Sequence, residues 1–319
     1  MKTSGIPLLN FDGQDLVTEI LRSISIQTVV FGRAVLGAPW ALRVDLPGRA
    51  VFHVVLRGHC WVKADNEKPL RLVHGDTVLF PRADAHDLSN EPGVPSRPIT
   101  ELLVKHPMTS DRRFCYGGEG KLTVLLCGAF QLDSPKLNML EILLPPFLYI
   151  RCKGNETSTQ LGPLTECVET ELKVSRPGGQ AIVARMTEAF LLQTIRDNML
   201  SSTNEERGLM GILRDNSIGR ALRSIHQRPE FRWSVSTLGR EANLSRSAFA
   251  ARFKMRVGLT PQEYLHRYRC GKALQLLRNT EAKIHDIAHC VGYASEPSFS
   301  KAFKRATGAS PGSFRKPNP

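Results

Sequence analysis

Hydrophobic and polar positions alternate over residues 50–90 in a way typical of short β-strands. The segments VFHVVLRGHCWVK and PLRLVHGDTVLFP are divided by the turn residues Gly58, Gly75-Asp76 and Pro81. Three later segments with short apolar runs are further candidate strands: TELLVKH, KLTVLLCGAFQL and PFLYIRCKG. Many short strands separated by turn signals favour a β-barrel or sandwich here.

The apolar period becomes helical after residue 180. The segment AIVARMTEAFLLQTIRDNMLSSTNEERGLMGILR, residues 181–214, predicts two helices joined by the polar SSTNEER, and the preceding PGG marks a boundary. Its first helix carries a stripe formed by Ile182, Met186, Ala189-Phe190 and Gln193. This stripe fits either a cover over the strands or an interface, and both interpretations stay open.

One short pattern occurs twice near the end of the chain. SRSAFAARFKMRVGLTP spans residues 245–261, and SEPSFSKAFKRATGASP spans residues 295–311. Each copy begins with a serine suited to an N-cap and carries two phenylalanines at i, i+4 spacing, hence on one buried face. Gly258 and Gly308 suit the helix C-termini, and a proline follows each. Both copies therefore predict a capped amphipathic helix.

A second short helix is expected before each copy, in STLGREANL and HDIAHCVGYA. Asn243 and Gly292 suit the turn between the two helices of each pair. Helix, tight turn and capped helix form the helix-turn-helix pattern, although a plain helical hairpin has the same outline. Between the pairs, PQEYLHRYRCGKALQLLRNT predicts one helix of about 17 residues, about 25 Å long. That length suits two recognition helices in successive major grooves, which lie about 34 Å apart.

Charge favours a polyanion partner for this region. The chain has 319 residues and a formal net charge of +13. Residues 215–319 hold 19 Lys and Arg against 7 Asp and Glu, whereas residues 1–214 hold 24 against 23. Nearly all the excess charge therefore lies beside the duplicated motif, which indicates double-stranded DNA as the partner.

Other features narrow the class of protein. No apolar run reaches the about 18 residues of a membrane span, and MKTSGIPLLNFDGQDLV lacks the apolar core of a signal peptide. We therefore expect a cytoplasmic protein without a membrane partner. Seven cysteines occur singly with no CxxC pair, which argues against a zinc knuckle or a disulfide scaffold.

Residues 215–319 resemble the DNA-binding domain of the AraC/XylS family of bacterial transcription regulators. Besides the duplicated motif, the resemblance includes Tyr264-Leu265, Arg269, Ala273, Leu276-Leu277, Ile287-Ala288, Gly292-Tyr293, Ser310-Pro311 and Phe314-Arg315. It implies sequence-specific regulation, more often activation than repression, with RNA polymerase as a protein partner.

The residues expected to face DNA lie opposite the phenylalanine pairs or flank them. They are Arg246, Ser247, Ala250, Ala251 and Lys254 in the first helix, and Glu296, Pro297, Ser300, Lys301 and Lys304 in the second. Lysine and arginine suit phosphates or guanine edges, glutamate suits cytosine, and alanine suits the thymine methyl. The family often has a basic residue where this chain has Ala251, so base readout by the first helix is weaker. Arg252 is a further phosphate candidate.

GDTVLFPRADAHDLSN resembles the second cupin motif through Gly75, Pro81, His86 and Asn90. Cupin enzymes hold a metal through two histidines and a glutamate of the first motif and one histidine of the second. Here the first motif offers His53, with Val55 at the second histidine position and no glutamate following. Packed or hydrogen-bonded histidines are therefore favoured over a metal site, and we expect no cofactor and no catalysis. Strand alternation would place His59 on the face of His53, with Cys60 opposite.

The sequence thus predicts an α+β multidomain chain. Residues 1–180 form a cupin-like β-barrel sensor, residues 181–214 a helical linker or homodimer interface, and residues 215–319 an all-α domain with two helix-turn-helix motifs. His53 and His86 are the expected effector anchors. The effector is a small molecule or an oxidant, with Cys60, Cys115, Cys127, Cys152 and Cys167 as candidates for oxidation. A cupin enzyme fused to a DNA-targeting module and an architectural DNA-binding protein are the alternatives.

Overall fold

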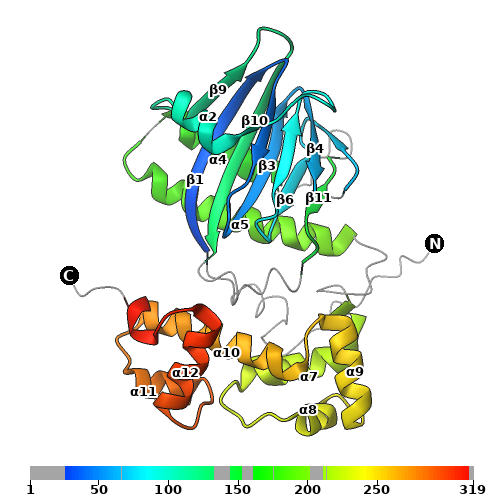
Figure 1. Cartoon of the computed structure of the whole chain (residues 1–319), viewed down its shortest axis with the longest axis vertical. Coiled ribbons are helices and arrows are strands. Elements are labelled where there is room, and N and C mark those ends of the chain that lie inside the picture. Colours follow the sequence, from blue (N-terminus) through cyan, green and yellow to red (C-terminus); the bar gives the residue numbers. More distant parts are fainter. Residues whose placement is uncertain are drawn as a thin grey trace. The chain divides into compact units, whose positions relative to one another are not determined.

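The computed structural model describes residues 26–65, 67–132, 144–152, 161–174, 176–201, 211–212 and 214–315. These residues belong to two compact units, one of strands and helices up to residue 201 and one of helices from residue 211 (Figure 1). Within the described residues, no helix is long and apolar enough to cross a membrane. The N-terminal segment, most of the polar SSTNEER and most of the second helix expected before residue 214 lie outside the described residues.

The first unit contains two β-sheets. The larger sheet has the strand order β11-β6-β3-β10-β1-β9, and the smaller sheet has the order β5-β4-β7-β2-β8. The strands of the larger sheet are β1 (Ile26–Gly37), β3 (Arg49–Arg57), β6 (Thr77–Phe80), β9 (Arg113–Gly117), β10 (Leu122–Leu132) and β11 (Leu148–Ile150). Those of the smaller sheet are β2 (Ala41–Val44), β4 (His59–Ala64), β5 (Leu70–Val73), β7 (His86–Ser89) and β8 (Arg97–Pro98).

The strands expected over residues 50–90 are present, but the expected barrel is not seen as a closed one. Both sheets keep two edge strands, and no pairing among the described strands joins one sheet to the other. β3 passes into β4 of the other sheet through Gly58, whose φ of 79° is left-handed. A Cβ there would lie 2.6 Å from the carbonyl oxygen of Leu122, so the turn requires glycine.

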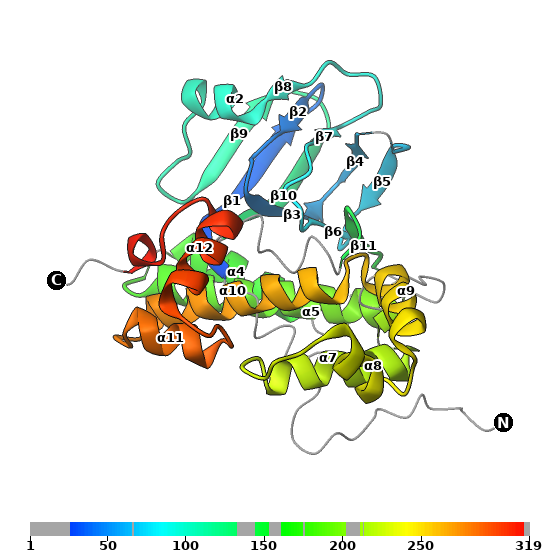
Figure 2. The ribbon, with the colours of Figure 1, turned by 60° about the horizontal axis from the view of Figure 1, so that its bottom comes forward.

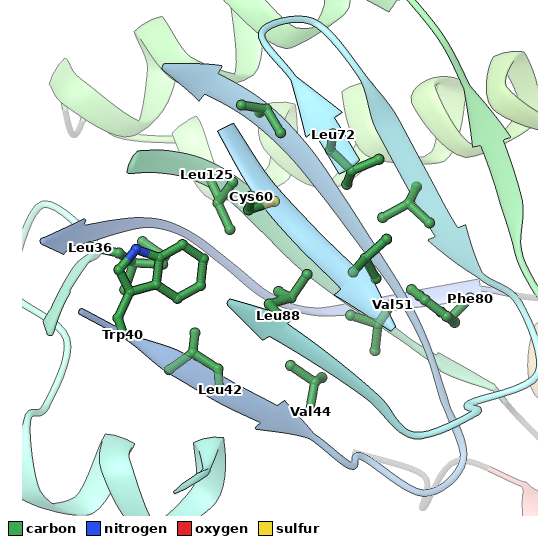
Figure 3. Close-up of a cluster of buried hydrophobic side chains, with 14 of the residues drawn as sticks. Leu36, Trp40, Leu42, Val44, Val51, Cys60, Leu72, Phe80, Leu88 and Leu125 are labelled. Carbon is green, nitrogen blue, oxygen red and sulfur yellow. The ribbon is translucent and has the colours of Figure 1, made fainter. Parts of the chain in front are cut away.

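The core of the first unit lies between the two sheets. Figure 3 shows Leu42 and Val44 of β2 together with Val51 of β3 and Leu88 of β7 in this layer. Inward positions alternate along β3, where Val51, His53 and Val55 face the core. Phe52 faces the other way and lies 4.9 Å, between ring centroids, from Phe190 of α5 (Gly179–Ser201). A helix therefore covers the outer face of the larger sheet.

Two helices of this unit differ from the sequence prediction. TELLVKH was expected as a strand, but α2 spans Ile99–Lys105. Ile99, Leu102 and Leu103 pack on the core at helical spacing, while Val104 is 83% exposed, so the apolar run has a period of 3.6 rather than 2. α4 (Leu161–Val174) was not predicted, and it ends before the PGG boundary. The expected boundary at residue 180 falls in the first turn of α5.

The second unit is all-helical. Its elements are α7 (Asn216–Gln227), α8 (Val235–Glu241), α9 (Arg246–Val257), α10 (Pro261–Asn279), α11 (Ile284–Cys290), α12 (Glu296–Thr307) and the 3₁₀ helix η2 (Pro311–Phe314). Both views show α10 as a long helix with α7, α8 and α9 at one end and α11 and α12 at the other (Figure 2). Its 19 residues make it about 28 Å long.

The predicted helix ends are confirmed. Ser245 and Ser295 are the N-caps of α9 and α12, and their side chains accept hydrogen bonds from the backbone N–H groups of Ala248 and Ser298. Gly258 and Gly308 cap the C-termini with φ values of 85° and 88°. The two copies of the motif therefore fold alike because each carries its own start and stop residues.

Candidate nucleic-acid interface and sensor site

The two recognition helices are fixed by their phenylalanine pairs. Phe249 and Phe253 of α9 are fully buried, and the Phe253 ring lies 5.7 Å from that of Tyr264 of α10. Phe299 and Phe303 of α12 are buried in a second cluster at the other end of α10. Each recognition helix therefore packs against α10 through the face that carries its phenylalanine pair, and its opposite face is exposed to solvent.

The turns that precede the recognition helices have matching backbone conformations. Asn243 and Gly292 both have a positive φ, 54° and 86°. A Cβ on Gly292 would lie 2.6 Å from the carbonyl oxygen of Pro229 and 2.5 Å from Nη2 of Arg269. The glycine is therefore required by close packing as well as by its dihedral angle.

Most of the residues expected to face DNA are exposed. They are Arg246, Ser247, Ala251, Lys254, Pro297, Lys301 and Lys304. Ala250, Glu296 and Ser300 are half-buried, so they lie at the edge of the exposed face. Met255 of α9, 50% exposed, and Arg305 of α12 also belong to the solvent faces and were not singled out from the sequence. A count at 100° per residue from the second phenylalanine of each pair would have found both.

Arg252, expected to serve phosphates, has an intramolecular partner. Its Nε lies 2.6 Å from Oδ2 of Asp215, the N-cap residue of α7, and Arg256 Nε lies 3.4 Å from the same oxygen. Sequence reasoning missed this pair because Asp215 and Arg252 are distant in the chain. Asp215 was not singled out from the sequence, although an aspartate directly before an amphipathic segment is a typical N-cap signal that could have found it.

A hydrogen-bonded aromatic cluster supports the first helix-turn-helix. Nε2 of His226 lies 2.8 Å from the hydroxyl of Tyr264, and its ring stacks on that of Tyr268 at 4.2 Å. Burial lowers the pKa of His226 to about 3, so the imidazole is neutral. This cluster is structural, because it lies under the recognition helix and away from its exposed face.

In the first unit, the structure brings His53 and His86 together. Their Nε2 atoms are 2.9 Å apart, and the two side chains are 3% and 0% exposed. The His86 ring stacks on Phe80 at 3.7 Å. Nδ1 of His86 lies 3.0 Å from the carbonyl oxygen of Asp84, and Nδ1 of His53 lies 3.1 Å from Sγ of Cys127. The motif spacing thus predicted the histidine pair, whereas Cys127, from a separate strand, gave no signal in the sequence.

Cys127, His53, His86 and the Asp84 carbonyl form a hydrogen-bonded series, called the histidine chain below. The positions of its hydrogens follow from one group that can only accept. A backbone carbonyl only accepts, so His86 carries its hydrogen on Nδ1 and donates to Asp84. A neutral His86 then accepts at Nε2 from His53, and a neutral His53 accepts at Nδ1 from the Cys127 thiol. Every polar hydrogen of the histidine chain therefore takes part in a hydrogen bond. The direction of donation runs from Cys127 to the Asp84 carbonyl.

The electrostatics agree with neutral groups. Burial lowers the pKa of His53 well below its usual range, and it lowers the pKa of His86 to about 4. Burial raises the pKa of the Cys127 thiol to about 12. Cys60 also lies in the core between the sheets, with a raised pKa, so the expectation that it points away from His53 is wrong. The turn at Gly58 resets the strand alternation on which that expectation rested.

The described residues contain no group of three His, Cys, Asp or Glu side chains arranged to hold a metal. Beside His53 lies a cavity of about 140 Å³ between the two sheets, whose wall includes His53 and Cys127 but not His86. Asn90, matched in the cupin motif, accepts a hydrogen bond from the backbone N–H of Trp40 at 2.7 Å, which is a structural role.

The fold and these sites define a DNA-binding protein with a cupin domain. A cupin family model matches residues 15–199, and a helix-turn-helix domain model matches residues 238–317. A putative AraC-like transcription regulator of Streptomyces lividans is 31% identical over 304 residues, which cover 95% of this chain and 98% of that protein. The chain therefore belongs to the AraC-like transcription regulators and carries the cupin domain of that group.

Two further proteins are similar to this chain. The RCS-specific HTH-type transcriptional activator RclR of Escherichia coli is 25% identical over 306 residues, covering 94% of this chain and 97% of that protein. The crystal structure of unsaturated fatty acid bound ToxT from Vibrio cholerae matches with a TM-score of 0.36 and 14% identity, covering 90% of this chain and 95% of that one. The relatives are named as transcription regulators, which favours regulation over the fused-enzyme alternative.

Proposed function

We propose that residues 215–319 bind double-stranded DNA by placing α9 and α12 in two successive major grooves on one face of the duplex. The observation that carries this proposal is the duplication itself, with two capped recognition helices held at the two ends of α10. The helix length of about 28 Å is close to the about 34 Å between successive grooves. The concentration of basic residues in this unit supplies the attraction to phosphate.

In this arrangement the two recognition helices have different tasks. Lys301 reaches a base edge, whereas Lys254 and Lys304 contact phosphates. Glu296, Pro297 and Ser300 adjust the fit of α12 to the groove. Arg246, at the start of α9, contacts the DNA backbone. Ser247, Ala250 and Ala251 are short, so α9 contributes apolar contact with thymine methyl groups more than hydrogen bonds.

The first unit acts as the sensor in this proposal. Residues 1–180 receive the signal, and residues 181–214, including α5, relay it to the DNA-binding unit. Phe190 of α5 packs on Phe52, the neighbour of His53 in β3, so α5 contacts the strand that borders the cavity. The relative RclR is named an activator, which supports activation through RNA polymerase. A homodimer formed through the same helices is part of the proposal.

A small molecule is favoured over an oxidant as the signal. Oxidation requires a thiolate, and the raised pKa of Cys60 and of Cys127 keeps both protonated. Of the other candidate cysteines, Cys115 and Cys167 are exposed and Cys152 is half-buried. His53, in the cavity wall, and His86, which holds it, are the polar residues through which the cavity responds.

A footprint of the full chain on its own promoter region tests the DNA arrangement. Protection of two major-groove patches about one helical turn apart on one face is expected. The affinity should fall steeply between 50 and 200 mM salt, by about a thousandfold or more if six or more phosphates are neutralised. Protection of a single patch, or an affinity independent of salt, contradicts two-groove binding.

The sensing arm has a separate test. His86→Ala and His53→Ala should abolish induction in a reporter assay while the affinity of the uninduced protein for DNA stays unchanged. Effector and DNA sites must be coupled for regulation, so the effector must change the DNA affinity of the parent protein. Induction that survives both substitutions places the signal elsewhere.

A further inference from the structure

The cavity in the first unit is bordered by both sheets and one helix. Its wall is formed by β1, β3, β9 and β10 of the larger sheet, by β2 and β7 of the smaller one, and by α2. Figure 3 shows part of this wall, where Leu42 and Val44 of β2 lie near Leu88 of β7. Phe114 and Met108 complete it near α2. The side chains that meet in the cavity are therefore mainly aliphatic or aromatic.

The polar residues in the wall have partners outside the cavity. Both ring nitrogens of His53 are engaged, one by His86 and one by Cys127. Arg33 directs its guanidinium to the outer side, where it lies 3.5 Å from Asp111 and 3.7 Å from Glu169. Cys127 donates its only hydrogen to His53. His53 and Cys127 therefore have no hydrogen left to donate to an occupant. Nε of Arg33 is buried without a hydrogen-bond partner among the described residues, but the charged end of this side chain lies by the Asp111 and Glu169 carboxylates.

Arg49 is the remaining charged residue of the wall. It is the first residue of β3, and it is half-buried. A side chain in this position lays its aliphatic part along the apolar surface and keeps its guanidinium in water. Arg49 can therefore border the cavity through its methylene groups and does not require an anion inside.

A polar or charged occupant would lose its hydration without gaining hydrogen bonds, which costs several kcal/mol. Dry apolar cavities of about 150 Å³ bind benzene, and this cavity measures about 140 Å³. We propose that the cavity binds a neutral apolar molecule of about the size of one six-membered carbon ring. A regulatory effect of this ligand on DNA binding rests on the proposed sensing function. The binding of the ligand in the cavity does not.

Calorimetric titration of the full chain with toluene and with benzoate tests the ligand class. The two probes share one ring and differ in charge, so a charge-independent site would treat them alike. We expect saturable toluene binding and an affinity for benzoate at least tenfold weaker. Tighter binding of benzoate, or no binding of toluene, overturns the proposal.

Variants of the wall test the location. Ala129→Leu adds three carbons to a residue that is 4% exposed in the wall, and it should weaken toluene binding at least tenfold. Leu103→Ala enlarges the cavity from α2 and should allow the larger naphthalene to bind. Val104→Ala, at an 83% exposed neighbour on the same helix, is the control that should change neither. Circular dichroism shows whether each variant is folded.

The outcomes separate this inference from the proposed function. Unchanged toluene affinity in folded Ala129→Leu, or naphthalene binding that Leu103→Ala does not improve, contradicts the cavity as the binding site. A wall-dependent toluene site whose occupancy leaves DNA affinity unchanged supports the ligand class and contradicts the sensing role of that ligand.

Discussion

The Asp215 carboxylate lies 2.6 Å from Nε of Arg252 and joins the start of α7 to the recognition helix α9. The same side chain caps α7 by accepting hydrogen bonds from the backbone N–H groups of Ser217 and Ile218. Burial raises the pKa of Asp215, but the hydrogen bonds from Arg252 and Ile218 outweigh it, so the pKa lies below its usual range. One ionised carboxylate thus holds the helix that must meet DNA.

Asp215→Ala should lower the free energy of unfolding of the second unit by about 2 kcal/mol. Loss of the cap accounts for about 1 kcal/mol, and the pair with the partly exposed Arg252 adds about 1 kcal/mol or less. Asp215→Asn keeps a cap and should cost about half as much. Hydrogen exchange of α7 and α9 measures the local change. Equal costs for the two variants would show that the ion pair, not the cap, dominates.

The contrast between Asn243 and Gly292 gives a matched pair. Alanine in a left-handed conformation costs about 1–2 kcal/mol at either position. At Gly292 the new Cβ must also displace the Pro229 carbonyl and Arg269, so Gly292→Ala should cost clearly more than Asn243→Ala. The second major-groove patch should then be lost from the footprint while the first remains. Similar costs at both positions would mean that the loop of Pro229 yields.

Lys301 and Lys304 separate base reading from phosphate binding. Lys301→Ala should weaken specific binding by about 1–3 kcal/mol, with little effect on random duplex, if it meets a base edge. Lys304→Ala should weaken both by similar factors, because phosphate contacts are independent of sequence. Competition between the target duplex and a random duplex measures each factor. Identical behaviour of the two variants shows that the reading face of α12 is centred elsewhere.

Most of the helices of the DNA-binding unit could be predicted from local sequence signals. Its caps, its turn residues and its buried phenylalanine pairs all lie within short segments, so propensity, patterning and turn chemistry predicted the same helices. The partner of Arg252 escaped because it depends on a contact across 37 residues. The solvent positions of Met255 and Arg305 escaped because the exposed face was drawn too narrowly around the lysines.

The fold of the first unit was harder to predict from the sequence, for physical reasons. The short apolar run of TELLVKH is compatible with a helix or with a strand. Only the contacts of Ile99 and Leu103 with the core decide in favour of the helix α2. Sheet closure depends on long-range pairing that no segment encodes alone. Likewise, the position of Cys127 beside His53 depends on the register of β3 with β10, in which these two residues are paired.

The assigned hydrogens of the histidine chain can be observed directly. Nitrogen-15 spectra of histidine-labelled protein at neutral pH should show His86 as the Nδ1–H tautomer and His53 as the Nε2–H tautomer. Cys127→Ser should preserve this pattern, since a hydroxyl also donates to His53. Cys127→Ala removes the donor to Nδ1 of His53, but the tautomer should persist because His53 still donates from Nε2 to His86. The opposite tautomers in the parent protein would reverse the chain and free the Cys127 sulfur as an acceptor.

The same neutral histidines predict acid sensitivity of the first unit. An unfolded histidine gains its proton near pH 6.5, whereas burial holds the pKa of His86 at about 4 in the fold. The unfolded state therefore binds more protons between these values, and stability is lost as the pH falls through that window, by about 3 kcal/mol for His86 alone. Hydrogen exchange of β3, corrected for its intrinsic pH dependence, should show this loss. His226 lies in the other unit, so a signal local to β3 excludes its contribution. His86→Gln removes one of the two titrating groups and should reduce the pH dependence of β3, leaving the part that belongs to His53. A flat profile in the parent protein would mean that the histidine pair shares a proton.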